Sequence, residues 1–84
     1  MGFKFFVTMA TYASDYRGPE VHVDEVDVNP VDCQAAAEQG RTENRHTMVI
    51  EVELPLSEVE LRKWILPAHD KTVRGIVTIK EVTE

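Results

Sequence analysis

The sequence is poor in the residues that usually build a covalent framework or an active site. Its 84 residues include one cysteine, four glycines and three histidines. A single cysteine excludes an intrachain disulfide, and no Cys-x-x-Cys or His-Glu-x-x-His spacing is present to hold zinc. The glycines are isolated, which excludes a glycine-rich loop for phosphate. We therefore expect neither a metal ion nor a cofactor.

Long apolar runs and an excess of basic residues are also missing. No apolar run approaches the roughly 20 residues that a membrane-spanning helix needs. Nine basic residues stand against fifteen carboxylates, which gives a net charge of −6. This sign argues against direct nucleic-acid binding and against adhesion to anionic lipid, because both need clustered lysines and arginines. We expect a cytoplasmic protein in which Cys33 is a small buried side chain.

What is present is an ordinary globular composition, 43% hydrophobic and 29% charged. It predicts a single compact domain over residues 1–84. Alternating apolar residues predict four strands. Their approximate ranges are Phe3 to Thr11, Glu20 to Val28, His46 to Leu54 and Thr72 to Val82.

In the second of these strands, the alternation of apolar residues shifts by one position. Val21 and Val23 alternate with one parity, and Val26 and Val28 alternate with the other. One extra residue at Asp24-Glu25 would return all four valines to the same face. The sequence therefore predicts a β-bulge at this point.

Two helices are predicted from the residues at their ends. Asn29 is the expected N-cap of the first helix and Pro30 its first residue. Gly40 is expected to end that helix in the left-handed conformation. The second helix begins with a capping box between Ser57 and Glu60 and ends before Pro67.

The strand over residues 46–54 decides the expected architecture. Met48, Ile50 and Val52 point to one side, whereas Glu51 and Glu53 point to the other. Two carboxylates on one face indicate that no other layer of the chain covers it. Both helices are therefore expected on the apolar side.

The predicted fold is accordingly a two-layer α+β sandwich. It has a four-stranded mixed or antiparallel sheet, two short helices on one face and the element order ββαβαβ. Helical connections between parallel strands are right-handed as a rule. The order of the strands within the sheet does not follow from the sequence.

The face of Glu51 and Glu53, which is expected to be free of helices, is the candidate functional surface. By strand parity it carries the residues that we expect to bind a partner: Phe6, Val49, Glu51, Glu53, Arg74 and Ile76. An exposed apolar stripe bordered by charge is typical of a protein–protein interface, although scattered exposed apolar side chains are common and need no function. We expect a small acidic, non-enzymatic binding module. It would form a homodimer or bind a protein partner through this face or through an edge strand.

Two other functions fit the same residues. The acidity suits an inhibitor or decoy of a nucleic-acid-binding machine encoded by a mobile element, and carboxylates strung along one ridge would favour it. A small enzyme with a site between protomers is the other alternative. It would require a pocket that holds His22, His46 or His69 beside a buried carboxylate. No catalytic residue is assigned.

Overall fold

The computed structural model describes residues 2–13, 18–67 and 78–82. Its elements are, in chain order, β1 (Lys4–Tyr12), β2 (Glu20–Asp27), α1 (Pro30–Thr42), β3 (Thr47–Glu53), α2 (Glu58–Ile65) and β4 (Thr78–Glu81). β1 lies between β2 and β3 in an antiparallel sheet, and β4 pairs with the other side of β3. The coarse prediction is confirmed: a small α+β structure with an antiparallel sheet and two helices.

The strand predicted over about Thr72 to Val82 lies mostly outside the described residues. Its described part, β4, pairs antiparallel with residues 50–53 of β3. The N–H of Val82 then donates a hydrogen bond of 2.8 Å to the carbonyl oxygen of Val49. The full strand, and the order ββαβαβ that requires it, stay predictions.

The pairing of β1 with β2 contains the predicted bulge. The register shifts between Thr8 and Met9, and Asp24 is the extra residue on β2. Val23 and Val26, on either side of Asp24, consequently lie on the same face of the sheet. The prediction of a bulge at Asp24-Glu25 is confirmed.

Both helices begin with the predicted capping groups. Asn29 Oδ1 accepts the N–H of Val31 at 3.0 Å, and Pro30 is the first residue of α1. At α2 the Ser57 hydroxyl oxygen accepts the N–H of Glu60, and the Glu60 carboxylate accepts the N–H of Ser57, both at 3.2 Å. These contacts satisfy amides that the helix geometry leaves without an internal partner.

The end of α1 differs from the prediction. The helix continues past Gly40 to Thr42, and the positive φ, 63°, belongs to Asn44. The prediction that Gly40 ends the helix in the left-handed conformation is wrong. Gly40 is buried, and a Cβ atom added there would lie 2.5 Å from Cγ2 of Thr47. The absence of a side chain at Gly40 allows the helix to lie this close to β3.

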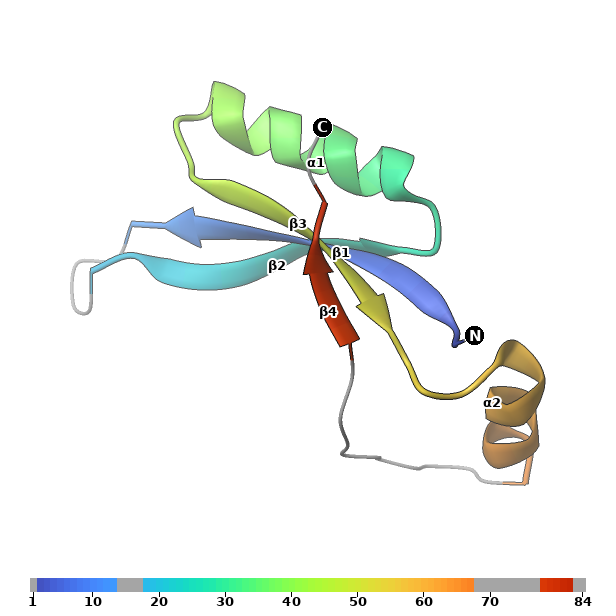
Figure 1. Cartoon of the computed structure of the whole chain (residues 1–84). Coiled ribbons are helices and arrows are strands. Elements are labelled where there is room, and N and C mark those ends of the chain that lie inside the picture. Colours follow the sequence, from blue (N-terminus) through green and yellow to red (C-terminus); the bar gives the residue numbers. More distant parts are fainter. Residues whose placement is uncertain (1, 14–17, 68–77, 83–84) are drawn as a thin grey trace.

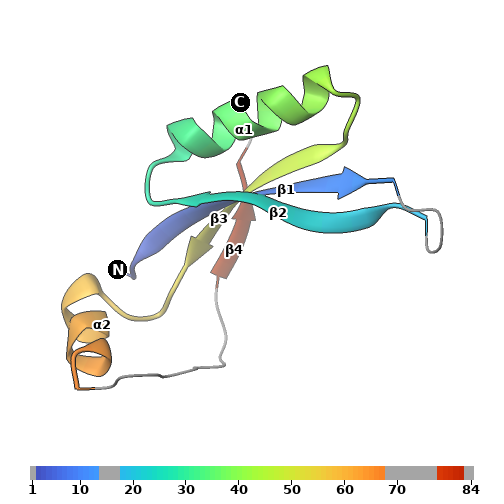
Figure 2. The same ribbon diagram turned by 180° about the vertical axis from the view of Figure 1, so that it is seen from behind.

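α1 covers the sheet face that was expected to be open (Figures 1 and 2). Thr8 Oγ1 donates a hydrogen bond of 2.7 Å to the carbonyl oxygen of Cys33, and Thr47 Oγ1 donates one of 3.2 Å to that of Ala37. Val49 is only 4% exposed and packs with Cys33 and Ala37. The prediction that the face of Val49 is open is therefore wrong.

Handedness and side-chain size explain the difference. β2 and β3 are both antiparallel to β1, so α1 connects two parallel strands. The right-handedness of such crossovers fixes which face the helix covers, whatever the polarity of that face. The covered face also presents small side chains, including Thr8 and Ala10, toward Cys33 and Ala37 of the helix. Small residues on both sides allow close packing.

α2 lies beyond the end of β3, away from the sheet (Figures 1 and 2). Near its start, the N–H of Phe3 donates a 2.8 Å hydrogen bond to the carbonyl oxygen of Leu56. The prediction that both helices cover one face is wrong, since in the described part of the chain only α1 does so. Residues 54–57 alone separate β3 from α2. The capping box at Ser57 therefore starts the helix before the chain has turned back over the sheet.

Candidate interaction surface

The sheet face opposite α1 carries the larger apolar side chains of β1, β2 and β3. Strand register places ten residues on it: Phe5, Val7, Met9, Thr11, Val21, Val23, Val26, Met48, Ile50 and Val52. We call this set the open face. Neither helix lies over it in Figure 1 or in Figure 2. Met48, Ile50 and Val52, which were expected to face the helices, thus lie on the side of the sheet away from α1.

The valines of β2 are the most exposed part of the open face. Val21, Val23 and Val26 are 63%, 57% and 54% exposed, respectively. Complete burial of a valine side chain stabilises a protein by about 1.5–3 kcal/mol. Because more than half of each valine is in water, covering the three would contribute on the order of 1 kcal/mol each.

The open face carries no charged residue. Each charged or histidine side chain of β1, β2 and β3 that has a register partner lies on the α1 side: Lys4, Glu20, His22, Glu25, Asp27, Glu51 and Glu53. An antiparallel sheet with one face in water normally places its polar residues on that face. Here the arrangement is reversed, and the face left open has the composition of a buried one.

A groove of about 420 Å³ continues the open face toward α2. Phe3 and Leu54 line it from the strand ends. From α2 and its C-cap, the lining residues are Leu61, Ile65 and Leu66, together with the charged Glu58 and Arg62. The N–H of Leu54 donates a 2.9 Å hydrogen bond to the carbonyl oxygen of Phe3, which extends the pairing of β1 with β3. Ile65 and Leu66 remain largely exposed. The apolar surface therefore extends from the sheet onto one side of α2.

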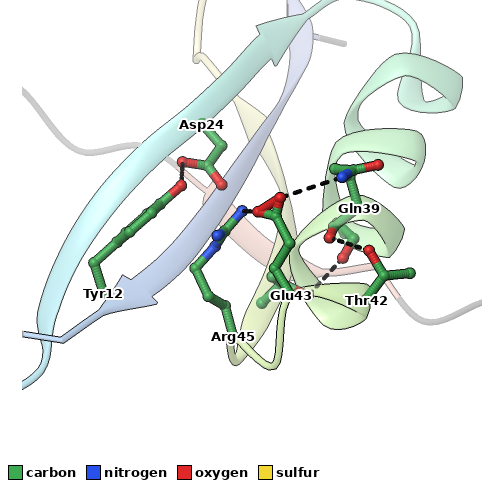
Figure 3. Close-up of polar contacts among 8 residues, drawn as sticks. Tyr12, Asp24, Gln39, Thr42, Glu43 and Arg45 are labelled. Atoms are coloured by element: carbon green, nitrogen blue, oxygen red, sulfur yellow. Dashed lines mark hydrogen bonds and ion pairs between the residues drawn. The ribbon is translucent and has the colours of Figure 1, made fainter.

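A polar cluster connects α1 to the sheet at the end of β1 (Figure 3). The Tyr12 hydroxyl donates a 3.0 Å hydrogen bond to Asp24, and this bond is the main reason that the pKa of Tyr12 is raised. The Arg45 guanidinium lies 4.5 Å from the centre of the Tyr12 ring and pairs with Glu43. Hydrogen bonds lower the pKa of Glu43; the one from Gln39 is the largest cause, and the one from Arg45 is the second. Because these side chains contact one another, we interpret the cluster as a structural connection.

The predicted partner-binding residues do not share an open surface. Val49 is buried beneath α1, and Phe6 packs against the same cluster. Glu51 and Glu53 are half-buried and lie on the α1 side by register. The other two predicted residues lie outside the described ones: Arg74 and Ile76. The geometry that grouped these six residues is therefore wrong for Phe6 and Val49.

The residues of the open face were not predicted to form a surface, although sequence patterns could have indicated it. Val21, Val23 and Val26 were correctly placed on one face, but both helices were expected on the apolar side of the sheet. Two signals could have reversed the assignment. One is the set of small residues on the opposite parity, such as Thr8 and Ala10. The other is the alanine-rich surface of α1, which packs against small side chains and does not fit over Phe5 or Met9 as closely.

The pocket that would favour an enzyme is not found in residues 2–13, 18–67 and 78–82. His22 lies 3.4 Å from Glu20, and both side chains are about half exposed. His46 lines a hollow whose other walls carry no carboxylate. Thr8 is the only buried polar residue among residues 2–13 and 18–67, and the described residues contain no cluster of possible metal ligands. His69 lies outside them.

Comparison with protein-family models, with curated proteins and with solved structures finds no match. No helix in the described ranges has the length and apolar character to span a membrane.

Proposed function

We propose that this protein is a non-enzymatic binding module whose open face forms the core of a protein–protein interface. The observation that carries the proposal is the separation of charge across the sheet. Within β1, β2 and β3, one face has seven charged or histidine residues, and the other has none and leaves the valines of β2 more than half exposed. The centre of an interface is depleted of charged residues in the same way. A contiguous exposed apolar patch usually marks an interaction site.

The open face is a better candidate than either edge of the sheet. β2 is one edge strand, but the bulge at Asp24 interrupts the row of backbone groups that an added strand would pair with. β2 also carries Glu20, Glu25 and Asp27 and no lysine or arginine. Bulges and charged side chains are the devices by which proteins protect an edge from strand addition. At the other edge, the described part of β4 is only four residues long.

A photo-cross-linking amino acid at position 23 tests the proposal in cells. Val31, on α1, provides a matched control position, because it is also a valine and is 61% exposed against 57% for Val23. We expect irradiation to give a discrete protein adduct from position 23 and none from position 31.

The mass of the adduct then identifies the kind of partner. An adduct of twice the chain mass indicates a second copy, and an adduct of another mass indicates a different protein. If position 23 gives no adduct, or if positions 23 and 31 give the same adducts, the open face is not an interface and the proposal is wrong.

One observation favours the acidic decoy as a second candidate function. β2 presents carboxylates at Glu20, Asp24, Glu25 and Asp27 along one edge of the sheet. Three of them already have partners within the chain, since Glu20 contacts His22, Asp24 accepts from Tyr12 and Asp27 accepts from the N–H of Asn29. A decoy would bind a basic nucleic-acid-binding protein with an affinity that falls steeply with salt. An affinity that does not change with salt concentration would exclude the decoy function.

We also propose that the sheet has four strands, with the last extending over about residues 72–82, and that the protein works in the cytoplasm. The pairing of β4 with β3 supports the first proposal. The second is supported by Cys33, which is fully buried and is the only cysteine of the chain. A protein without disulfides suits a reducing compartment.

A further inference from the structure

We infer that the partner on the open face is a second copy of this chain. The two copies pack sheet against sheet across a two-fold axis, and α2 of each copy flanks the sheet of the other. The inference rests on the proposed function, since it names the occupant of the same surface. Charge, symmetry and area each support it.

Charge favours a second copy because the chain is strongly acidic. Two chains of net charge −6 repel each other wherever their carboxylates meet. The carboxylates of β2 and β3 with a register partner lie on the α1 side. Within β1, β2 and β3, the open face is therefore the side on which two identical acidic chains meet without opposing like charges. A basic partner, by contrast, would need carboxylates to contact, and the open face has none.

Symmetry favours it because a two-fold interface must be complementary to itself. A face that carries donors or charges has to match each group with its counterpart on the other copy. The open face avoids this requirement, since nine of its ten residues are apolar and the tenth is Thr11. Two such faces pack as in a β-sandwich, at a separation of about 10 Å.

Area explains the part played by α2. Three strands about 4.8 Å apart, each about seven residues long at about 3.4 Å per residue, give a face of roughly 14 by 24 Å. This plan area is well below the roughly 800 Å² that each partner contributes to a standard interface. The groove beside Phe3 and Leu54 continues the same surface. Ile65, the last residue of α2, and Leu66, its C-cap, are 62% and 76% exposed. Including α2 brings the interface toward the required size.

The mass of the purified chain in solution is the first test. Light scattering combined with size-exclusion chromatography should give twice the 9.5 kDa of the single chain, and the dimer should persist at low micromolar concentration. Val23→Glu should weaken dimerisation by roughly 100-fold or more, because the two-fold axis buries two new carboxylates. Val31→Glu, which adds the same charge to α1, should remain dimeric. Ile65→Glu should weaken the dimer if α2 takes part.

A second measurement does not depend on the variants folding. In a mixture of isotope-labelled and unlabelled wild-type chains, NMR contacts between chains should connect methyl groups of the open face, such as those of Val23, Val26 and Ile50. Ala37, which lies beneath α1, should show none. Intermolecular contacts confined to other surfaces would overturn the inference.

The outcomes separate this inference from the proposed function. If the chain is monomeric at several hundred micromolar and a soluble paramagnetic probe reaches the open-face methyl groups, no second copy covers them and the inference is wrong. A position-23 adduct of another mass would then still support an interface with a different protein. If the chain is monomeric and those methyl groups are shielded, residues of the same chain cover the face, and both proposals fail.

Discussion

Thr8 Oγ1 donates a 2.7 Å hydrogen bond to the carbonyl oxygen of Cys33, and both residues are fully buried. This contact joins β1 to α1 and lies on the covered face of the sheet. Thr8→Val keeps the shape of the side chain and removes the donor. We expect the free energy of unfolding to fall by about 0.5–1.5 kcal/mol, measured by urea denaturation.

Thr11→Val is the control for this substitution, because Thr11 lies on the same strand but on the open face. It should leave the stability unchanged or raise it, since a hydroxyl is removed from an apolar surface. If Thr8→Val and Thr11→Val have the same effect, the hydrogen bond to Cys33 contributes nothing measurable.

Gly40→Ala should destabilise the protein although it replaces glycine within a helix. At an unconstrained helix position, alanine is favoured over glycine by about 1 kcal/mol. At Gly40, the added methyl group would lie 2.5 Å from Cγ2 of Thr47. We expect a net loss of about 1–3 kcal/mol in the free energy of unfolding.

The double variant Gly40→Ala with Thr47→Ser tests the cause. Serine lacks the methyl group that the new Cβ would contact, and it keeps the hydroxyl that donates to the carbonyl oxygen of Ala37. Thermal or urea unfolding of the four proteins in the cycle should show recovery of most of the loss. If the two substitutions change the free energy of unfolding additively, the contact with Thr47 is not the reason for glycine at this position.

Tyr12 should ionise at a higher pH than a free tyrosine. Its hydrogen bond to Asp24 is the largest cause of the raised pKa, while the positive charge of Arg45 acts in the opposite direction. A group with a raised pKa contributes its stability fully below its ordinary pKa of 10.0, and that contribution is lost as the pH rises through the folded-state value.

The measurement is an absorbance titration of phenolate in a Tyr16→Phe background, which leaves Tyr12 as the only tyrosine. Asp24→Asn should lower the pKa of Tyr12, and Arg45→Met should raise it further. A pKa that is insensitive to Asp24→Asn would contradict the contact shown in Figure 3.

Acid should loosen α2 through its capping box. The N–H of Ser57 is the main cause of the lowered pKa of Glu60. A carboxylate with a lowered pKa contributes stability above its ordinary value of 4.5, and that contribution is lost as the pH falls through the folded-state value. The protection factors of the α2 amides, which compare the observed exchange rate with the intrinsic rate at the same pH, should therefore fall as the pH drops through that value.

Glu60→Gln provides the matched variant, because glutamine keeps an oxygen that accepts the N–H of Ser57 but does not titrate. The protection factors of its α2 amides should depend more weakly on pH in the acid range. Glu58→Gln, in the same turn, does not alter the capping box and should behave like the natural sequence. An equal acid response in Glu60→Gln and the natural sequence would rule out the cap as its source.

Local structure could be predicted from the sequence wherever a few adjacent residues determine it. Asn29, the Ser57–Glu60 pair and the bulge near Asp24 each depend on neighbours in the chain, and all three predictions are confirmed. Neighbouring residues determine where a helix begins, because capping side chains bond to amides two or three residues away.

The covered side of the sheet could not be predicted in the same way. The face of Glu51 and Glu53 was expected to face water because it is charged, but the handedness of the β2–α1–β3 connection decides which face is covered. That argument requires the strand order β2–β1–β3, which no local pattern reveals. The role of Gly40 was missed for a similar reason, since its close contact with Thr47 joins residues from two elements.

The fully buried position of Cys33 gives the protein an internal reporter of its own opening. Its sulfur is the only thiol of the chain and is covered where α1 meets the sheet. A thiol reagent can reach it only when the helix separates from the strands, so the labelling rate measures how often that separation occurs. Spectroscopic probes can likewise be attached to introduced surface cysteines of the folded protein without first removing the natural one.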